Sequence, residues 1–134
     1  MNRFIVSLSL AMVVAGCPSS SSTTRAFCEK SISCDPDTDE NSPEEQSEID
    51  TCVENQEGFL RELRAHDDAA CADLAAAFDA QNVCNAALEC DELNAPRDST
   101  CADERAHIDA ACDAVVGTDC EADVALNCGL GGEP

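Results

Sequence analysis

Residues 42–64 read SPEEQSEIDTCVENQEGFLRELR, and they decide the fold class because a strong helix start leads into a helical repeat of apolar residues. Ser42 can cap the helix, Pro43 is preset for its first turn, and Glu45 stands at the third helical position of a capping box. Six apolar residues then follow at helical intervals: Ile49, Cys52, Val53, Phe59, Leu60 and Leu63. The stretch therefore predicts a helix over residues 43–64.

The rest of the chain also favours helices, because it is rich in alanine, poor in β-branched residues and without the alternating pattern of a strand. One further helix opens at residues 98–100, where Thr100 and Asp103 have capping-box spacing, and Gly117 is its expected C′ residue. The other helices are expected at residues 26–33, 71–78, 84–88 and 120–128. We therefore predict an all-α fold, a small disulfide-stapled bundle of about five or six short helices over residues 26–128, with a flexible tail at 129–134.

The cysteines are expected to stabilise a fold whose apolar core is small. After residue 16 the chain holds only 18 apolar residues larger than alanine and cysteine, too few for a large core. Ten cysteines follow Cys17, none in the C-x-x-C spacing of redox pairs or zinc ribbons, so five structural disulfides are expected, with the pairing left open by the spacing. Cys101 and Cys112 on one helix would stand about 16 Å apart, so each must reach a neighbouring element. The ten are Cys28, Cys34, Cys52, Cys71, Cys84, Cys90, Cys101, Cys112, Cys120 and Cys128.

The N-terminus has the layout of a secretory signal peptide: Arg3, an apolar run over residues 4–14, and small residues before Cys17. Residues 14–17, V-A-G-C, resemble the lipobox of bacterial lipoproteins. The resemblance implies that residues 1–16 are removed and that Cys17 carries the lipid. An ordinary secretory peptide with a coincidental cysteine is the alternative interpretation.

The residues after Cys17 fit the same resemblance. Residues 18–25, PSSSSTTR, are polar and without apolar periodicity, so residues 17–25 are expected to be a lipidated cysteine with a flexible tether. Pro18 stands where this family commonly has Asp to signal inner-membrane retention, so the resemblance implies the outer membrane. In overall pattern the chain is similar to small cysteine-rich helical lipoproteins of Gram-negative bacteria without assigned activity.

The charge is strongly acidic, with 7 basic and 28 acidic residues and a net charge of −21. This balance excludes nucleic acid as a partner. It keeps the domain soluble, and it could equally steer a cationic partner toward it.

Two eight-residue segments repeat, RAHDDAAC at 64–71 and RAHIDAAC at 105–112, and each has cysteines before and after it. We interpret them as duplicated helical hairpins. The repeat contains both histidines of the chain, His66 and His107, each near a carboxylate, Asp67 or Asp109. A His-Asp dyad or a metal pair would use such residues, whereas a copied solvent-facing helix turn would explain them without any chemistry.

Asp35, Asp37 and Asp39 alternate in an acidic segment, as ligands do at the start of a calcium loop. Glu40 stands where an EF-hand needs glycine and Gln46 where it needs glutamate, so the segment is not an EF-hand and predicts weak calcium binding at most. The other reading is a solvated linker whose charge favours the start of the helix that follows.

Together these features predict a membrane-anchored lipoprotein that acts as a non-enzymatic structural or interaction module of the cell envelope, without a cofactor. Its expected partners are the lipid bilayer, through acylated Cys17, and an unknown envelope protein. A calcium-binding lipoprotein is the first alternative, and a hydrolase using His66 or His107 is the second.

Overall fold

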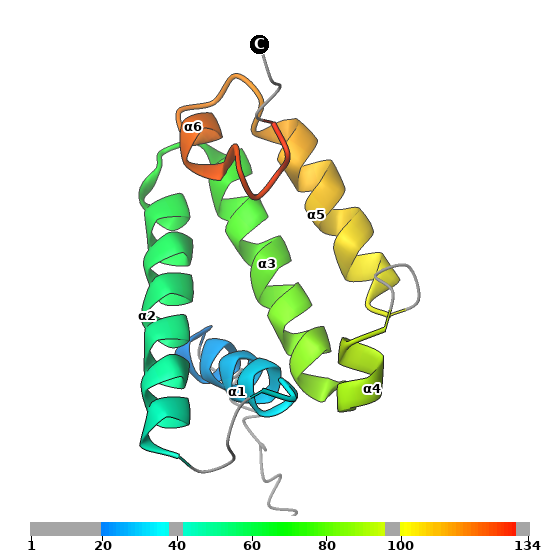
Figure 1. The fold of residues 1–134 in the computed structure, drawn as a ribbon. Coiled ribbons are helices and arrows are strands. Elements are labelled where there is room, and N and C mark those ends of the chain that lie inside the picture. The colour runs from blue at the N-terminus through cyan, green and yellow to red at the C-terminus, as the bar shows by residue number, and fades with distance from the viewer. Residues whose placement is uncertain (1–19, 38–41, 96–99, 131–134) are drawn as a thin grey trace, which may run out of the picture.

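The computed structural model describes residues 20–37, 42–95 and 100–130, and all regular structure in these ranges is helical (Figure 1). The helices are α1 (Ser20–Ser33), α2 (Pro43–Ala65), α3 (Ala69–Ala87), α4 (Cys90–Leu93), α5 (Ala102–Ala114) and α6 (Glu121–Val124). The prediction of a small all-α fold of about six short helices is confirmed. Within these ranges, none of the helices combines the length and apolar character needed to cross a membrane.

Helix α3 is central to the packing, because it contacts α1, α2 and α5. In Figure 1, α2, α3 and α5 run side by side, α1 crosses one end of the α2–α3 pair, and α6 lies at the other end, where α2 passes into α3. The buried cluster of the core draws on α2, α3, α5 and the segment around α6. Only five of its eleven buried residues are leucine or valine: Leu60, Leu63, Leu74, Val115 and Val124.

Five disulfides join the elements of this thin core, and they use all ten of the cysteines predicted to pair. One bridge joins α1 to α2, one joins the end of α1 to α4, two join α3 to the starts of α5 and α6, and one joins α5 to the turn after α6. Cys101 and Cys112 each bond to another element, as their helical separation requires. The pairs are Cys28–Cys52, Cys34–Cys90, Cys71–Cys120, Cys84–Cys101 and Cys112–Cys128.

The helix predicted from its cap is confirmed almost to the residue. The backbone N–H of Glu45 donates to the Ser42 hydroxyl at 2.9 Å, and Pro43 begins α2. The helix ends at Ala65, one residue beyond the predicted end.

The start of α1 corrects the predicted tether. The helix begins at Ser20 and not at residue 26, so residues 20–25 are helical and not a flexible linker. Thr24 and Cys28, one turn apart, are both fully buried, and Arg25 pairs with Asp50 of α2 at 3.1 Å. Apolar periodicity missed this turn of α1 because its buried residue, Thr24, is not apolar. Residues 1–19, with the predicted signal peptide and Cys17, lie outside the described residues.

Three other boundaries differ from the prediction. The short helix expected at 84–88 is the last part of α3, since no glycine or proline interrupts the alanine-rich stretch, and α4 then follows as a single unpredicted turn. The helix expected at 120–128 is only the four residues of α6. The tail expected from residue 129 begins too early, because Leu130 packs against the core.

The helix predicted to start at a Thr100–Asp103 capping box starts differently. Its N-cap is Cys101, which has a left-handed backbone with φ 51° and no side-chain cap. Cys101 is held there by its bond to Cys84 of α3. At the other end α5 closes at Val115, and Gly117, two residues later, adopts the positive φ of 84° that favours glycine.

The repeated octapeptide adopts two different structures. In the first copy, residues 64–71, α2 ends, the chain turns and α3 begins. In the second, residues 105–112 form an uninterrupted part of α5. The bridges differ as well, because Cys71 bonds to Cys120 whereas Cys112 bonds to Cys128. The two copies therefore do not build duplicated hairpins, and that interpretation is wrong.

Candidate functional site

Of the two histidines that the repeat singled out, only His66 lies in a cluster of polar groups. It is the C-cap of α2, and a short turn separates it from Asp68, the residue whose carboxylate caps α3 by accepting from the N–H of Ala70 at 2.9 Å. His107 lies within α5 and is exposed, and no hydrogen bond or ion pair joins its side chain to another described residue. The two histidines of the repeat therefore have different environments in the structure.

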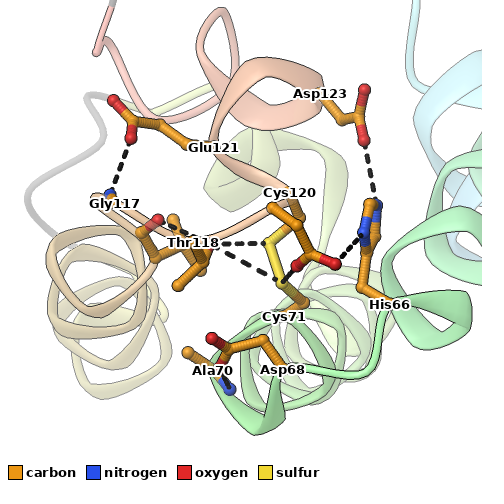
Figure 2. The surroundings of a disulfide bond; sticks show 11 residues. His66, Asp68, Ala70, Cys71, Gly117, Thr118, Cys120, Glu121 and Asp123 are labelled. Atoms are coloured by element: carbon orange, nitrogen blue, oxygen red, sulfur yellow. Dashed lines mark hydrogen bonds and ion pairs between the residues drawn. A yellow bond between two sulfur atoms is a disulfide. The ribbon is translucent and has the colours of Figure 1, made fainter.

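The His66 ring lies between two carboxylates of the segment around α6. Its Nδ1 atom is 3.1 Å from Oδ2 of Asp119, and its Nε2 atom is 3.0 Å from Oδ2 of Asp123. Figure 2 shows the ring turned toward Asp123, beside the Cys71–Cys120 disulfide. Asp67, the carboxylate that the sequence placed next to this histidine, is exposed and is not its partner.

This arrangement raises the pKa of His66 above its ordinary value. The largest cause is the hydrogen bond to Asp119, and the bond to Asp123 acts in the same direction, whereas burial opposes both. A protonated imidazolium can donate from both nitrogens at once, which the neutral ring cannot do. The site therefore favours the charged form of His66, with each N–H donating to a carboxylate.

The disulfide beside His66 links the residue that follows Asp119 covalently to α3. Cys71 and Cys120 are fully buried, and Asp119 directly precedes Cys120. The hydroxyl of Thr118 donates to the carbonyl of Val115 at 2.6 Å, and its oxygen lies 3.3 Å from Sγ of Cys120 (Figure 2). The turn before α6 is thereby ordered by local hydrogen bonds and by the covalent link to α3.

Two groups in the described residues have the proximity of metal ligands, but both consist mainly of bonded cysteines. In each group the two sulfurs belong to one disulfide, so they are not the thiolates that bind metals, and one carboxylate is left. Neither group is a metal site in the oxidised protein. The groups are Cys71, Asp119, Cys120 and Cys84, Cys101, Glu104.

The acidic segment predicted as a weak calcium site is only partly described. Asp35 and Asp37 are exposed, and the N–H of Asp37 donates to the Asp35 carboxylate at 3.0 Å, which makes a local turn. Asp39 lies outside the described residues. No third ligand gathers on Asp35 and Asp37 among the residues that the structure describes.

Sequence reasoning missed Asp119 and Asp123 as the partners of His66. Their spacing of four residues across the start of a helix was a usable signal, because it places two carboxylates on one face where a cation can meet both. The fold was needed to show which cation that is.

Comparison with known proteins adds no assignment. No family model, no curated protein and no solved structure matches the chain.

Proposed function

We propose that this chain is a bacterial lipoprotein, anchored through acylated Cys17, whose helical domain is a rigid non-enzymatic interaction module of the cell envelope. The pairing of the cysteines carries the proposal. Ten of the 11 cysteines bond to one another, which leaves no cysteine in the chain as a partner for Cys17. The remaining cysteine is the one at the end of V-A-G-C, where the lipobox resemblance puts the acyl chains.

The same bridges support an exported location for the domain. Disulfides persist in oxidising compartments such as the bacterial periplasm and cell surface, and they are rare in the cytosol. Five bridges in a domain of this size therefore support export, as does the signal-like N-terminus.

The start of α1 supports a position close to the membrane. Only residues 18 and 19 separate Cys17 from Ser20, where the helix begins. Consecutive Cα atoms are about 3.8 Å apart, so this connection reaches about 11 Å at most. An acylated Cys17 would hold the first turn of α1 near the headgroups, while the net charge of −21 would turn the rest of the domain away from anionic lipid.

The environment of His66 supports a non-enzymatic module over a hydrolase. Both ring nitrogens are engaged by carboxylates, and the raised pKa favours the protonated ring, which has no lone pair for a substrate proton. His66 is better suited to holding the α2–α3 turn against α6 than to acting as a base.

The test is the intact mass of the full chain, extracted from the membranes of a Gram-negative host. We expect a mass that starts at Cys17 with acyl chains added, with no alkylation before reduction and ten alkylated thiols after it. Cys17→Ser is the matched control, and it should leave the bridges intact while moving the protein from the detergent phase to the aqueous phase. An unacylated wild-type mass, or equal detergent partition of the two chains, would overturn the proposal.

A further inference from the structure

A pocket of about 350 Å³ lies between α1, α2, α3 and the turn after α6, away from the His66 site. Its lining has an unusual composition. Eight asparagine and glutamine residues are described, and six of them line this one pocket. They are Asn55, Gln56, Gln81, Asn82, Asn85 and Asn127.

The remaining lining residues are aromatic. Phe27, Phe59 and Phe78 complete the pocket, and they are the only phenylalanines in the described residues of a chain that has no tyrosine or tryptophan. All three are partly exposed, and Phe59 and Phe78 meet edge to face with ring centroids 5.3 Å apart. None of the nine lining residues is charged, although the chain carries 28 acidic residues.

Asn82 points to a ligand most directly. It is 94% buried, with 6% of its surface exposed, and its Nδ2 atom has no hydrogen-bond partner. Burying an amide without a partner costs free energy, and folded proteins avoid it. Because Nδ2 itself is shielded from solvent, a ligand oxygen in the pocket would accept this hydrogen bond once the Asn82 side chain has turned toward the pocket.

A second hollow lies next to this pocket on α3. This neighbour, of about 340 Å³, shares Phe78, Gln81, Asn85 and Asn127 with the first. Arg105 is among its lining residues, and Nη2 of that side chain is buried without a hydrogen-bond partner. The two hollows share these four residues, and we call them together the amide–aromatic groove; each is lined by one residue with an unsatisfied donor.

We propose that the amide–aromatic groove binds a neutral oligosaccharide. Side-chain amides both donate and accept, which matches sugar hydroxyl groups that do the same. The electron-rich faces of the phenylalanine rings attract the polarised C–H groups on the apolar face of a pyranose ring. The first hollow has no charged lining residue, and in the second hollow Arg105 and Asp109 have opposite charges, so the lining of the groove has no net charge to pair with a charged ligand.

A peptide is a poorer match to this lining. Strand addition needs an open sheet edge, which the described residues do not provide, and helix docking needs an apolar groove. Here six amides occupy the positions where such a groove would have aliphatic side chains. The saccharide proposal names a ligand for the interaction module proposed above and in that sense rests on it, but the groove stands whether or not Cys17 is acylated.

The test is a titration of the full-length chain, purified from bacterial membranes in a detergent without a sugar headgroup. The readout is the NMR signals of the asparagine and glutamine side-chain amides. The probes are maltotriose and triacetylchitotriose, with trialanine as the peptide comparison. We expect at least one saccharide to shift the signals of Gln81, Asn82 and Asn127 with saturation at millimolar concentrations.

Variants locate the binding. Gln81→Ala and Asn127→Ala each remove an amide shared by both halves of the groove, and each should weaken binding about tenfold. Gln46→Ala is the matched control, because it removes an exposed amide outside the groove and should leave the affinity unchanged.

Three results would overturn the proposal: no saturable shift with either saccharide, a saturable response to trialanine alone, or unchanged affinity in both groove variants. The intact mass of the same preparation reports acylation separately. Saccharide binding by an unacylated chain would overturn the proposed lipid anchor but support the saccharide site. An acylated chain that binds no saccharide would support the anchor and overturn the saccharide site.

Discussion

Nδ1 of His66, at the end of α2, lies 3.1 Å from Oδ2 of Asp119, the residue directly before the half-cystine Cys120. Because Cys120 bonds to Cys71 in the first turn of α3, the same two segments are joined twice. One link is covalent and independent of pH. The other is an ion pair that exists only while His66 is protonated.

The pH dependence of stability follows from the raised pKa of His66. A group whose pKa is higher in the folded state stabilises the fold fully below its unfolded-state pKa, and that contribution is lost as pH rises through the folded-state value. We therefore expect His66→Gln to lower the melting temperature most below the ordinary histidine pKa of about 6.5, and progressively less as the pH rises through the higher pKa of the folded state. Thermal unfolding followed by circular dichroism across a pH series measures the difference.

His107→Gln is the control for that series, because His107 is exposed on α5 and its side chain has no hydrogen bond or ion pair with another described residue. Its melting curves should follow those of the wild type at every pH. A loss in His66→Gln that stayed constant across the series would show that the ring contributes packing and not charge.

The N-cap of α2 predicts a pair of substitutions with opposite signs. Ser42→Ala removes the acceptor of the Glu45 N–H and should lower the free energy of unfolding by about 1 kcal/mol. Ser47→Ala, at an exposed position inside the same helix, should raise it by a few tenths of a kcal/mol because alanine is the better helix former. Urea denaturation of the two variants measures both, and equal effects would mean that the cap does not stabilise α2.

The start of α2 was predicted correctly from the sequence and the start of α1 was not, and one physical difference explains both results. The start of α2 is coded locally, by Ser42 and Pro43 together with an apolar repeat that follows at once. The first turns of α1 are stabilised by tertiary contacts instead: the burial of Thr24 and the pairing of Arg25 with Asp50. Neither contact leaves an apolar pattern in the sequence.

The octapeptide repeat is a second case in which tertiary contacts, and not the local sequence, decide the structure. Seven of eight residues agree, yet one copy turns at His66 and the other continues as helix. The different residue is Asp67 in the first copy and Ile108 in the second, and Ile108 packs against the core. An apolar residue at this position can anchor a continuous helix on the core, whereas an exposed aspartate cannot, so burial decided between the two structures.

The amide–aromatic groove did leave a signal that sequence reasoning overlooked. Phe78, Gln81, Asn82 and Asn85 recur at intervals of three, four and seven residues, so they share one face of α3. A face with this spacing normally buries aliphatic side chains, and amides in their place indicate a polar cavity. The pairing of the cysteines, in contrast, had no signal in the spacing, because it depends on which helices meet.

The bridges differ in how much of the unfolded chain they constrain. Cys71 and Cys120 are 49 residues apart, and Cys112 and Cys128 are 16 apart. Loop entropy alone makes the longer bridge more stabilising by about 1 kcal/mol. We expect the double replacement Cys71→Ala/Cys120→Ala to lower the free energy of unfolding more than Cys112→Ala/Cys128→Ala, as measured by guanidinium denaturation without reductant. The reverse order would show that local packing outweighs loop closure here.

Replacing Asn82 is expected to increase stability and to abolish saccharide binding. Asn82→Leu removes a buried amide whose Nδ2 has no partner, and the pocket of about 350 Å³ beside it leaves room for the larger side chain. Because an unsatisfied buried polar group costs free energy, the variant should gain about 1 kcal/mol of stability while losing the saccharide response. Asn55→Leu, at an exposed position on the rim of the same pocket, is the matched control and should change stability by less than about 0.5 kcal/mol. A lower melting temperature for Asn82→Leu would instead identify the Asn82 amide as a stabilising group of the fold, and the groove would lose its strongest support.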